Sequence, residues 1–301
     1  MRSTVNSATT NPATDTFVGY RNLLFTVAYE MLGSAADAED VLQETWLRWV
    51  QVDVDQVHDH RAYLVRITTR QALNRLRTLK RRKESYVGPW LPEPLLTTPD
   101  VAEGIELAET MSMALMLVLE TLSPTERAVF VLREVFDVSY EEIAAAVDKT
   151  PTTVRQIARR ARQHVEARRP RSVTSPDQAR AALESFQRAL ETGDPQGLLN
   201  VLAPDVVLLT DGGGIKTAAR VPIIGIEQVL RNLLVGFGKI SATLTTEPAV
   251  VNGNPALIVR WDNEIGIMTF RMENGRITGL YFVRNPEKLT HIDAPTTLSV
   301  R

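Results

Sequence analysis

The residues best suited to chemistry lie at the start of a basic helix that we expect near the middle of the chain. Thr150 is a favourable N-cap and Pro151 suits the first helical position, so the following side chains project from the first turns of that helix. Arginine and glutamine can pair with the edges of guanine and adenine, while threonine can hold a phosphate. The side chains expected to contact DNA are Thr150, Thr152, Thr153, Arg155, Gln156, Arg159 and Arg160.

A shorter helix is expected just before this one, beginning after the N-cap Ser139. Ala144, Ala145 and Ala146 would let the two helices pack closely across the short turn "DKTP". Two helices joined in this way form a helix-turn-helix, whose second helix reads the major groove. A helical hairpin inside a bundle is the alternative, but the crowding of basic residues at the exposed end favours DNA binding.

The net charge of −2 conceals a strong separation of charge along the chain. Residues 1–60 hold nine acidic residues and three Lys or Arg. Residues 61–83 hold nine Lys or Arg and no acid, and residues 149–171 hold eight with a single acid. Two solvated helix faces could explain the pattern, but two basic blocks that both lie on helices favour two contacts with a polyanion.

The length of 301 residues suggests roughly two domains of ordinary size. The chain has no cysteine, which excludes disulfides, thiolate metal sites and cysteine nucleophiles. No apolar run reaches the roughly 20 residues that span a bilayer, and the polar start lacks the apolar core of a signal peptide. We therefore expect a cytoplasmic protein without a membrane contact.

The hydrophobic pattern predicts two all-α helical domains, residues 17–86 and 104–170, after a flexible arm of residues 1–16. The first contains "YRNLLFTVAYEML", "DAEDVLQETWLRWV" and the basic helix "RAYLVRITTRQALNRLRTLKRRKES". The second contains "IELAETMSMALMLVLETL", a helix capped at "SPTE" and the helix-turn-helix. Between them, residues 87–103 are rich in proline, so they form a linker, and their apolar residues predict that this linker is docked.

After a short linker, residues 171–176, the character of the chain changes. In residues 177–301, one or two helices lead into strand-like runs, "DVVLLT", "SATLTTEPAVV", "PALIVRW", "IGIMTFRM" and "RITGLYFVR", with "GIEQVLRNLLVGF" as an interposed helix. The turns "NGNP" and "ENG" separate strands as hairpins need. This pattern predicts an α+β domain with a curved antiparallel sheet.

Three segments together resemble an extracytoplasmic-function sigma factor of RNA polymerase. They are "DAEDVLQETWLRW", "YLVRITTRQALNRLR" and "LSPTERAVFVLREVFDVSYEEIAAAVDKTPTTVRQIARRAR", and the similarity covers about residues 17–169 in family order. The resemblance implies that the first domain docks on core RNA polymerase and opens the promoter −10 element, and that the second reads the −35 element. The residues that this analogy places against the polymerase are Asp37, Glu39, Asp40, Gln43, Glu44 and Trp46.

The basic helix would then serve the −10 element, because capture of unstacked bases needs cationic and stacking side chains. Many family members carry asparagine where Arg70 aligns, so this sequence departs from the family pattern there. The candidate side chains are His60, Arg61, Tyr63, Arg66, Arg70, Asn74, Arg75 and Arg77.

The C-terminal pattern resembles a SnoaL-like domain, a cone-shaped fold of the NTF2-like superfamily that a subgroup of these sigma factors carries. Its markers are "WLPEP", "DGGGIK" and "NPEKL", and in that subgroup the extension modulates activity in place of a separate anti-sigma protein. The resemblance implies that "WLPEP" lies across the glycine loop. The interdomain residues would be Trp90, Leu91, Pro92, Glu93, Pro94, Asp211, Gly212, Gly213, Gly214, Lys216, Asn285, Pro286 and Lys288.

The sequence therefore predicts a sigma factor that binds core RNA polymerase and promoter DNA, with no cofactor, no metal and no catalytic residue. A one-component helix-turn-helix regulator with a ligand-binding C-terminal domain is the alternative, and an unidentified small molecule could occupy the C-terminal cavity. Catalysis is disfavoured because the one histidine after residue 170 is His291, in the tail, which leaves carboxylates such as Asp205 and Asp262 without a histidine partner in the cavity.

Overall fold

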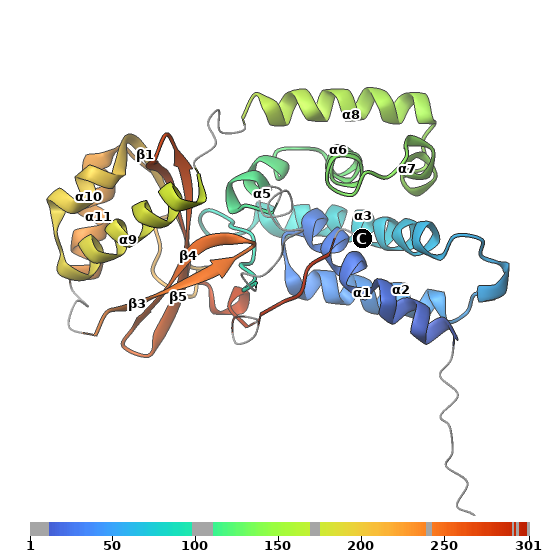
Figure 1. The fold of residues 1–301 in the computed structure, drawn as a ribbon, viewed down its shortest axis with the longest axis horizontal. Helices are drawn as coiled ribbons and strands as arrows, with labels where there is room; N and C mark the ends of the chain where they lie inside the picture. Colours follow the sequence, from blue (N-terminus) through green and yellow to red (C-terminus); the bar gives the residue numbers. More distant parts are fainter. Residues whose placement is uncertain are drawn as a thin grey trace, which may run out of the picture.

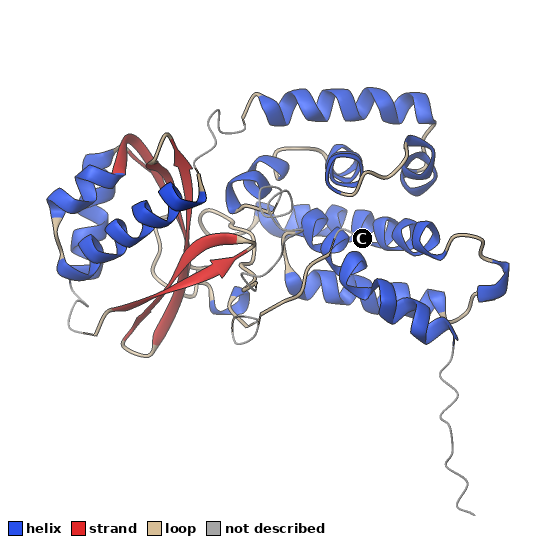
Figure 2. Ribbon diagram, viewed as in Figure 1, coloured by secondary structure: helices blue, strands red, loops and turns tan. Residues whose placement is uncertain are grey.

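The computed structural model describes residues 12–97, 111–168, 175–238, 243–290, 292 and 295–299. Within these residues, two helical domains are followed by a domain built on one sheet (Figures 1 and 2). The helical domains lie side by side, and the linker between them runs through the space that separates them from the sheet (Figure 1). None of the described helices is both long and apolar enough to cross a membrane.

The first domain contains α1 (Pro12–Leu32), α2 (Ala35–Trp49), the short 3-10 helix η1 (Val54–Gln56) and α3 (His60–Glu84). The side chain of Ser34 caps α2 and that of Asp59 caps α3, since each accepts a hydrogen bond from a backbone N–H of the first turn. Helix α1 begins inside the segment expected to be a flexible arm, because Ala13 is buried there. Residues 1–11 lie outside the described part of the chain.

The second domain contains α5 (Met113–Leu119), α6 (Pro124–Phe130), a π-helical turn η2 (Val131–Val135), α7 (Tyr140–Val147) and α8 (Pro151–Glu166). The capping box predicted at Ser123 is confirmed, with Glu126 as the reciprocal partner. The helix expected over residues 105–122 is described only as α5, because residues 98–110 lie outside the described part of the chain.

The third domain places α9 (Pro176–Thr192), α10 (Pro195–Val201) and α11 (Ile226–Gly238) on one face of a six-stranded sheet (Figure 1). The strands follow the order β2-β1-β6-β5-β4-β3. Their bounds are Leu202–Asp211 (β1), Ile223–Ile224 (β2), Thr245–Val251 (β3), Asn254–Trp261 (β4), Glu264–Glu273 (β5) and Arg276–Val283 (β6). The last element is the 3-10 turn η3 (Pro286–Lys288).

The expectation of a wholly antiparallel sheet is wrong for one pair of strands. Strand β1 pairs with β6 in parallel, with Leu208 opposite Leu280, whereas the other pairs are antiparallel. The chain leaves β1 through β2 and α11, forms the β3–β4–β5 meander, and re-enters beside β1 in the same direction. Because β1 and β6 run in parallel, the loop after β1 and the chain after β6 leave the sheet at the same edge.

Candidate nucleic-acid interface and interdomain contacts

Helix α8 separates its apolar and basic residues onto opposite faces. Val154, Ile157, Ala158, Ala161 and Val165 are buried against the rest of the second domain. The side chains predicted to contact DNA all lie outside this buried face: Thr150, Thr152, Arg155, Gln156, Arg159 and Arg160 are exposed, and Thr153 is half-buried. The structure thus brings the predicted DNA-reading residues onto one solvent-facing surface at the outer edge of the molecule (Figure 1).

The turn before α8 has the geometry that a helix-turn-helix needs. Asp148 ends α7 in the left-handed conformation, with φ of 57°, and the Thr150 side chain accepts a hydrogen bond from the N–H of Thr153 at 3.2 Å. Arg155 forms an ion pair of 2.8 Å with Glu141 of α7. Both partners of this pair are largely exposed, so little free energy is lost when Arg155 exchanges Glu141 for a base or a phosphate.

The −10 candidates cluster where the loop before α3 meets the start of that helix. A ring nitrogen of His60 lies 3.1 Å from the backbone oxygen of Val54, and the ring packs edge-on against Trp49. The guanidinium of Arg66 lies 4.8 Å from the centre of the Tyr63 ring. The start of α3 thus carries a cationic and aromatic surface, and Asn74 and Arg77 are exposed further along the same helix.

Part of that surface is covered by the helix-turn-helix. Arg70 donates hydrogen bonds to the backbone oxygens of Ala145, at 2.9 Å, and Ala146, at 3.4 Å, near the end of α7. These oxygens lie at the negative end of the helix dipole, where a cation is favoured. Tyr63 and Arg66 line a cleft of about 290 Å³ whose other wall includes Glu142 and Ala145 of α7.

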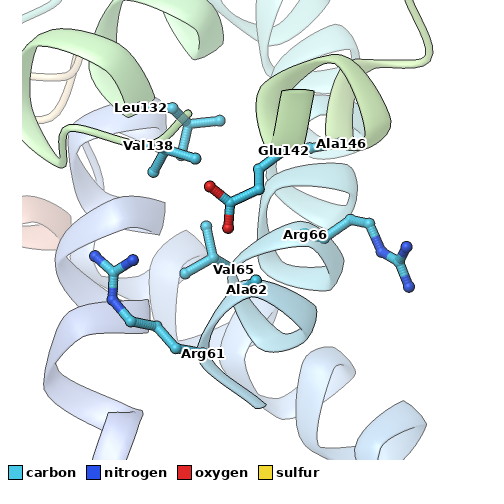
Figure 3. A pocket seen from close by; sticks show the side chains of 8 residues that line it. All are labelled: Arg61, Ala62, Val65, Arg66, Leu132, Val138, Glu142 and Ala146. Atoms are coloured by element: carbon cyan, nitrogen blue, oxygen red, sulfur yellow. The ribbon is translucent and has the colours of Figure 1, made fainter. Parts of the chain in front are cut away.

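Figure 3 shows how closely α3 and α7 approach each other. Glu142 reaches from α7 toward Ala62 and Val65 of α3, with Arg61 and Arg66 on either side. The gap that these side chains leave has a volume of only about 10 Å³, so it holds no more than a water molecule. The two predicted DNA-binding domains are therefore in direct contact in this conformation.

Helix α2 carries the residues predicted to bind the polymerase. Gln43 and Glu44 are exposed, and Trp46 is half-buried against Phe17, with the ring centres 5.1 Å apart. Trp49 is fully buried and donates its ring N–H to the backbone oxygen of Ala13, so it is a core residue.

The acids of α2 are not all free. Arg75 of α3 donates hydrogen bonds of 2.7 Å to both Asp37 and Asp40, which joins two predicted polymerase contacts to one predicted DNA contact. Glu39 pairs with Arg21 in the same way on the other side of the helix. Asp37 is buried, so its contact with Arg75 holds α2 and α3 together.

The linker between the helical domains is fixed by one buried carboxylate. Asp211, at the end of β1, accepts hydrogen bonds from the Tyr86 hydroxyl at 2.5 Å, the Leu91 N–H at 2.9 Å and the Lys288 ammonium at 2.7 Å. Lys288 also donates to the Leu91 carbonyl at 2.6 Å, and its Nζ lies 3.3 Å from the centre of the Trp90 ring. Loss of water on burial lowers the pKa of Lys288 to about 8 despite the nearby charge of Asp211. We call these five residues the clasp.

The three predicted motifs therefore meet at the clasp. The glycine loop turns tightly, because a Cβ on Gly212 would lie 2.1 Å from the Lys216 carbonyl oxygen, and one on Gly213 would lie 2.4 Å from the Asn285 amide. Asn285 donates its amide to the Tyr86 hydroxyl at 2.9 Å. Lys216 lies outside the clasp and pairs with Glu264 at 3.0 Å. Pro286 begins η3, the short turn that supplies Lys288.

Residues 92–94 of the linker dock on the first domain, which confirms the expectation of a docked segment. Glu93 is buried, and its carboxylate accepts a hydrogen bond of 2.8 Å from the N–H of Ala35 at the start of α2. Its backbone accepts from the Tyr29 hydroxyl at 2.5 Å and donates to the Gly33 carbonyl at 2.9 Å. Pro92 and Pro94 are buried on either side.

Asn252 is an interdomain residue whose sequence context indicates only a turn. Its amide donates to the Tyr29 hydroxyl at 3.0 Å and to the Met111 carbonyl at 3.2 Å, and it accepts from the N–H of Leu95 at 2.9 Å. One side chain thus joins the sheet domain to α1, the linker and the segment before α5. Positive φ at Asn252, followed by glycine, marks a turn but gives no sign of these contacts.

A second buried charge network joins the helical domains. Arg127 of α6 donates two hydrogen bonds to the Glu30 carbonyl of α1 and one, of 2.6 Å, to Glu120. Lys83 of α3 donates to the same Glu120 carboxylate at 2.5 Å. Burial would raise the pKa of Glu120, but the charges of Arg127 and Lys83 outweigh burial and lower this pKa to about 2.

The Glu30 carboxyl group is completely buried, and neither of its oxygens has a hydrogen-bond partner within the described part of the chain. Burial raises the pKa of Glu30 to about 8, although the charge of Arg127 opposes this change. The folded protein therefore binds a proton here that the unfolded chain loses at about pH 4.5. Between about pH 4.5 and about pH 8 the folded state holds more protons than the unfolded state. The free energy of unfolding therefore falls as the pH rises through this range.

Replacement of Glu30 with glutamine is expected to remove this dependence. At pH 4, below the start of this range, the variant and the original protein should melt together, whereas at pH 8 the variant should be more stable by roughly 2–4 kcal/mol. Thermal unfolding at both pH values measures the difference. Glu184→Gln, on the exposed face of α9, is the matched control and should change neither curve. A variant that is equally or less stable at pH 8 would contradict the assignment.

Comparison with known proteins identifies the two helical domains. The family models named Sigma-70 region 2 and Sigma-70 region 4 match residues 17–82 and 112–165. The ECF RNA polymerase sigma factor SigJ of Mycobacterium tuberculosis is 33% identical over 291 residues, which cover 91% of this chain and 92% of the relative. The chain belongs to the extracytoplasmic-function (ECF) family of RNA polymerase sigma factors. The probable sigma factor SigI of the same organism is 29% identical over 94% of this chain and 97% of the relative.

The similarity of this ECF sigma factor to SigJ extends through the sheet domain. The crystal structure of SigJ superposes with a TM-score of 0.75 at 29% identity, covering 92% of this chain and 98% of the other. The predicted fold, two helical domains and a SnoaL-like α+β domain, is confirmed, as is the resemblance to a sigma J-like subgroup. The ECF sigma factor binds RNA polymerase and recognises promoters, as predicted, and the alternative of a one-component regulator is not supported.

Proposed function

We propose that α8 of this ECF sigma factor reads the −35 element as duplex DNA. Arg155 and Gln156 would pair with base edges, while Arg159 and Arg160 would hold the backbone. The proposal is supported by the exposure of these side chains on one face of α8, within the segment that matches region 4. The threonines at the start of the helix would contact phosphates through their hydroxyl groups, where the helix dipole also favours an anion.

The −10 element would be captured by the start of α3 and the loop before it. Tyr63 and the exposed residues of α3 supply the stacking ring and the cations that an unpaired strand requires. Arg70 would be released from its backbone hydrogen bonds when α7 moves away, and the cleft that Arg66 shares with α7 would open. Arg75 is better suited to positioning α2, because it already binds two carboxylates.

The outer face of α2 would dock on the polymerase, with Trp46 as its aromatic anchor inside a charged rim that includes Gln43 and Glu44. Replacement of Trp46 with alanine is expected to weaken capture of core polymerase by roughly 10-fold to 30-fold, the usual effect of losing an aromatic anchor. Binding of an isolated −35 duplex should not change. Pull-down of core enzyme measures the effect, with Val235→Ala on α11 as the control for loss of an exposed apolar side chain. Equal capture by both variants would exclude Trp46 as an anchor.

The SnoaL-like domain would regulate the sigma factor by holding its linker. The observation that carries this proposal is the buried Asp211, which binds the linker through Tyr86, Leu91 and Lys288. While the linker is docked on both sides, α3 and α7 remain in contact and the −10 residues stay partly covered. A dedicated anti-sigma protein would then not be required, because the chain restrains itself.

We further infer that the SnoaL-like domain acts by binding and not by catalysis, and that the protein works in the cytoplasm, where its polymerase and promoter are found. Run-off transcription with purified core polymerase tests the proposed assignment. Base changes in the −35 element should alter how strongly substitutions in α8 affect transcription. Base changes in the −10 element should do the same for substitutions in α3. The assignment would be overturned if every variant responded equally to base changes in both elements.

A further inference from the structure

The SnoaL-like domain contains a large cavity between α11 and the sheet. Its volume is about 930 Å³, enough for a drug-sized molecule. Leu208, Phe237, Trp261 and Phe282 give it an apolar and aromatic lining, contributed by β1, α11, β4 and β6. This composition favours a ligand with a flat, largely apolar body.

The charged groups of the cavity favour an anion. Arg231 and Arg284 line it, against the single acid Glu227. Arg231 makes no ion pair with any residue in the described ranges of the chain. Arg284 donates to the Thr217 carbonyl and to Glu264, lies 4.8 Å from the centre of the Trp261 ring, and has a buried Nε without a partner among the described residues. A cation beside an aromatic wall suits an aromatic ring that carries an acidic group.

The rim of this cavity is continuous with the clasp. The N–H of Arg284 donates to the Asp211 carbonyl at 2.7 Å, so one residue contacts both places. Residues 217–219 of the rim directly follow the glycine loop. The docked linker touches the same segment, because a Cβ on Gly88 would lie 3.6 Å from the Ala219 carbonyl oxygen, and one on Gly214 would lie 3.3 Å from Val87.

We propose that this cavity is the binding site of an aromatic organic anion, and that the clasped conformation binds it more tightly than the open one. A docked linker orders the rim before the ligand arrives, and such preorganisation lowers the cost of binding. Because coupling between two sites is reciprocal, the ligand stabilises the clasp to the same extent. The ligand site rests on the cavity alone, whereas its effect on transcription rests on the proposed regulation by the clasp.

The site is tested on the full-length protein with 1-anilinonaphthalene-8-sulfonate, a fluorescent aromatic anion. We expect saturable binding of one probe molecule. Gly236→Trp should lower the affinity roughly tenfold or more, because residue 236 lines the cavity and its Cβ would meet nothing within 4 Å. Gly19→Trp makes the same substitution in equally open space on α1 and should leave the affinity unchanged. The proposed site would be contradicted if both variants lost affinity for the probe equally, or if both kept it.

The charge of the ligand is tested separately. Arg231→Gln should weaken binding of the sulfonate probe roughly fivefold and leave binding of the uncharged N-phenyl-1-naphthylamine unchanged. Arg180→Gln, which removes an exposed arginine of α9 outside the cavity, is the matched control and should affect neither probe. The same response of both probes to Arg231→Gln would contradict an anionic ligand.

The coupling is tested by opening the clasp. Lys288→Met should weaken binding of the sulfonate probe roughly fivefold or more, within the usual range of coupling between sites. If this variant changes transcription but not probe affinity, the clasp regulates and the proposed coupling is wrong. If it changes probe affinity but not transcription, the ligand site stands and the proposed regulation fails.

Discussion

Replacement of both Arg155 and Gln156 with alanine is expected to abolish promoter-specific binding without unfolding the protein. Each bidentate contact with a base contributes about 1–3 kcal/mol, so the pair should cost about 2–6 kcal/mol of discrimination, or roughly 30-fold to 20,000-fold. The fold should survive, because both side chains are exposed and the ion pair of Arg155 with Glu141 is at the surface. Competition between specific and scrambled −35 duplexes measures the loss.

The control for this prediction lies at the other end of the same helix. Gln163→Ala with Arg168→Ala removes the same two residue types from the exposed last turn of α8 and from the turn that follows it. This variant should bind all DNA somewhat less tightly, because one positive charge is lost, but should keep its preference for the specific duplex. If the Arg155 and Gln156 variant keeps that preference as well, α8 does not read the −35 element with its N-terminal half.

Replacement of Lys288 with methionine is expected to open the clasp and to raise transcription. Lys288 and Asp211 are both buried, and removal of one partner of a buried ion pair typically costs about 3–5 kcal/mol, because the other charge is left unpaired. The linker loses the bond from Lys288 to the Leu91 carbonyl at the same time. When the clasped form of the sigma factor limits the reaction, we expect this variant to give at least roughly tenfold more transcript than the original protein.

Two further variants make this result interpretable. Lys216→Met also removes a lysine of the SnoaL-like domain, but its partner Glu264 is half-buried, keeps Arg284 as a second partner and makes no hydrogen bond with the described part of the linker, so transcription should not change. Asp211→Asn with Lys288→Met leaves no unpaired charge and tests whether the single variant merely unfolds the domain. Unchanged transcription from a folded Lys288→Met protein would show that the clasp does not restrain the sigma factor.

The elements that the sequence predicted well are those determined by neighbouring residues. Ser123, Ser139 and Thr150 cap the helices that they were expected to cap, and five strand-like runs became strands. The meeting of the three clasp motifs was expected only through the resemblance to a family. No local pattern indicates that Asp211 is buried against Leu91.

Contacts between distant segments account for what the sequence did not predict. Asn252 follows the rules of a hairpin turn whether or not Tyr29 lies beside it, so its interdomain role left no local signal. Arg70 was expected to contact DNA, and the density of basic residues on α3 correctly indicated an exposed cation. The density of basic residues does not identify the partner of Arg70, however, and in this structure that partner is the end of α7.

We propose that the clasp keeps the two DNA-reading domains together until the polymerase and promoter separate them. Because the chain has no cysteine, Thr78→Cys on α3 and Gln163→Cys on α8 would carry the only two spin labels. Double electron–electron resonance should give one narrow, short distance for the free protein and a longer one for the complex with core polymerase and promoter DNA. Lys288→Met should shift the free protein toward the longer distance. The same distance in the free and bound states would show that the two domains do not separate when the protein binds the polymerase and promoter.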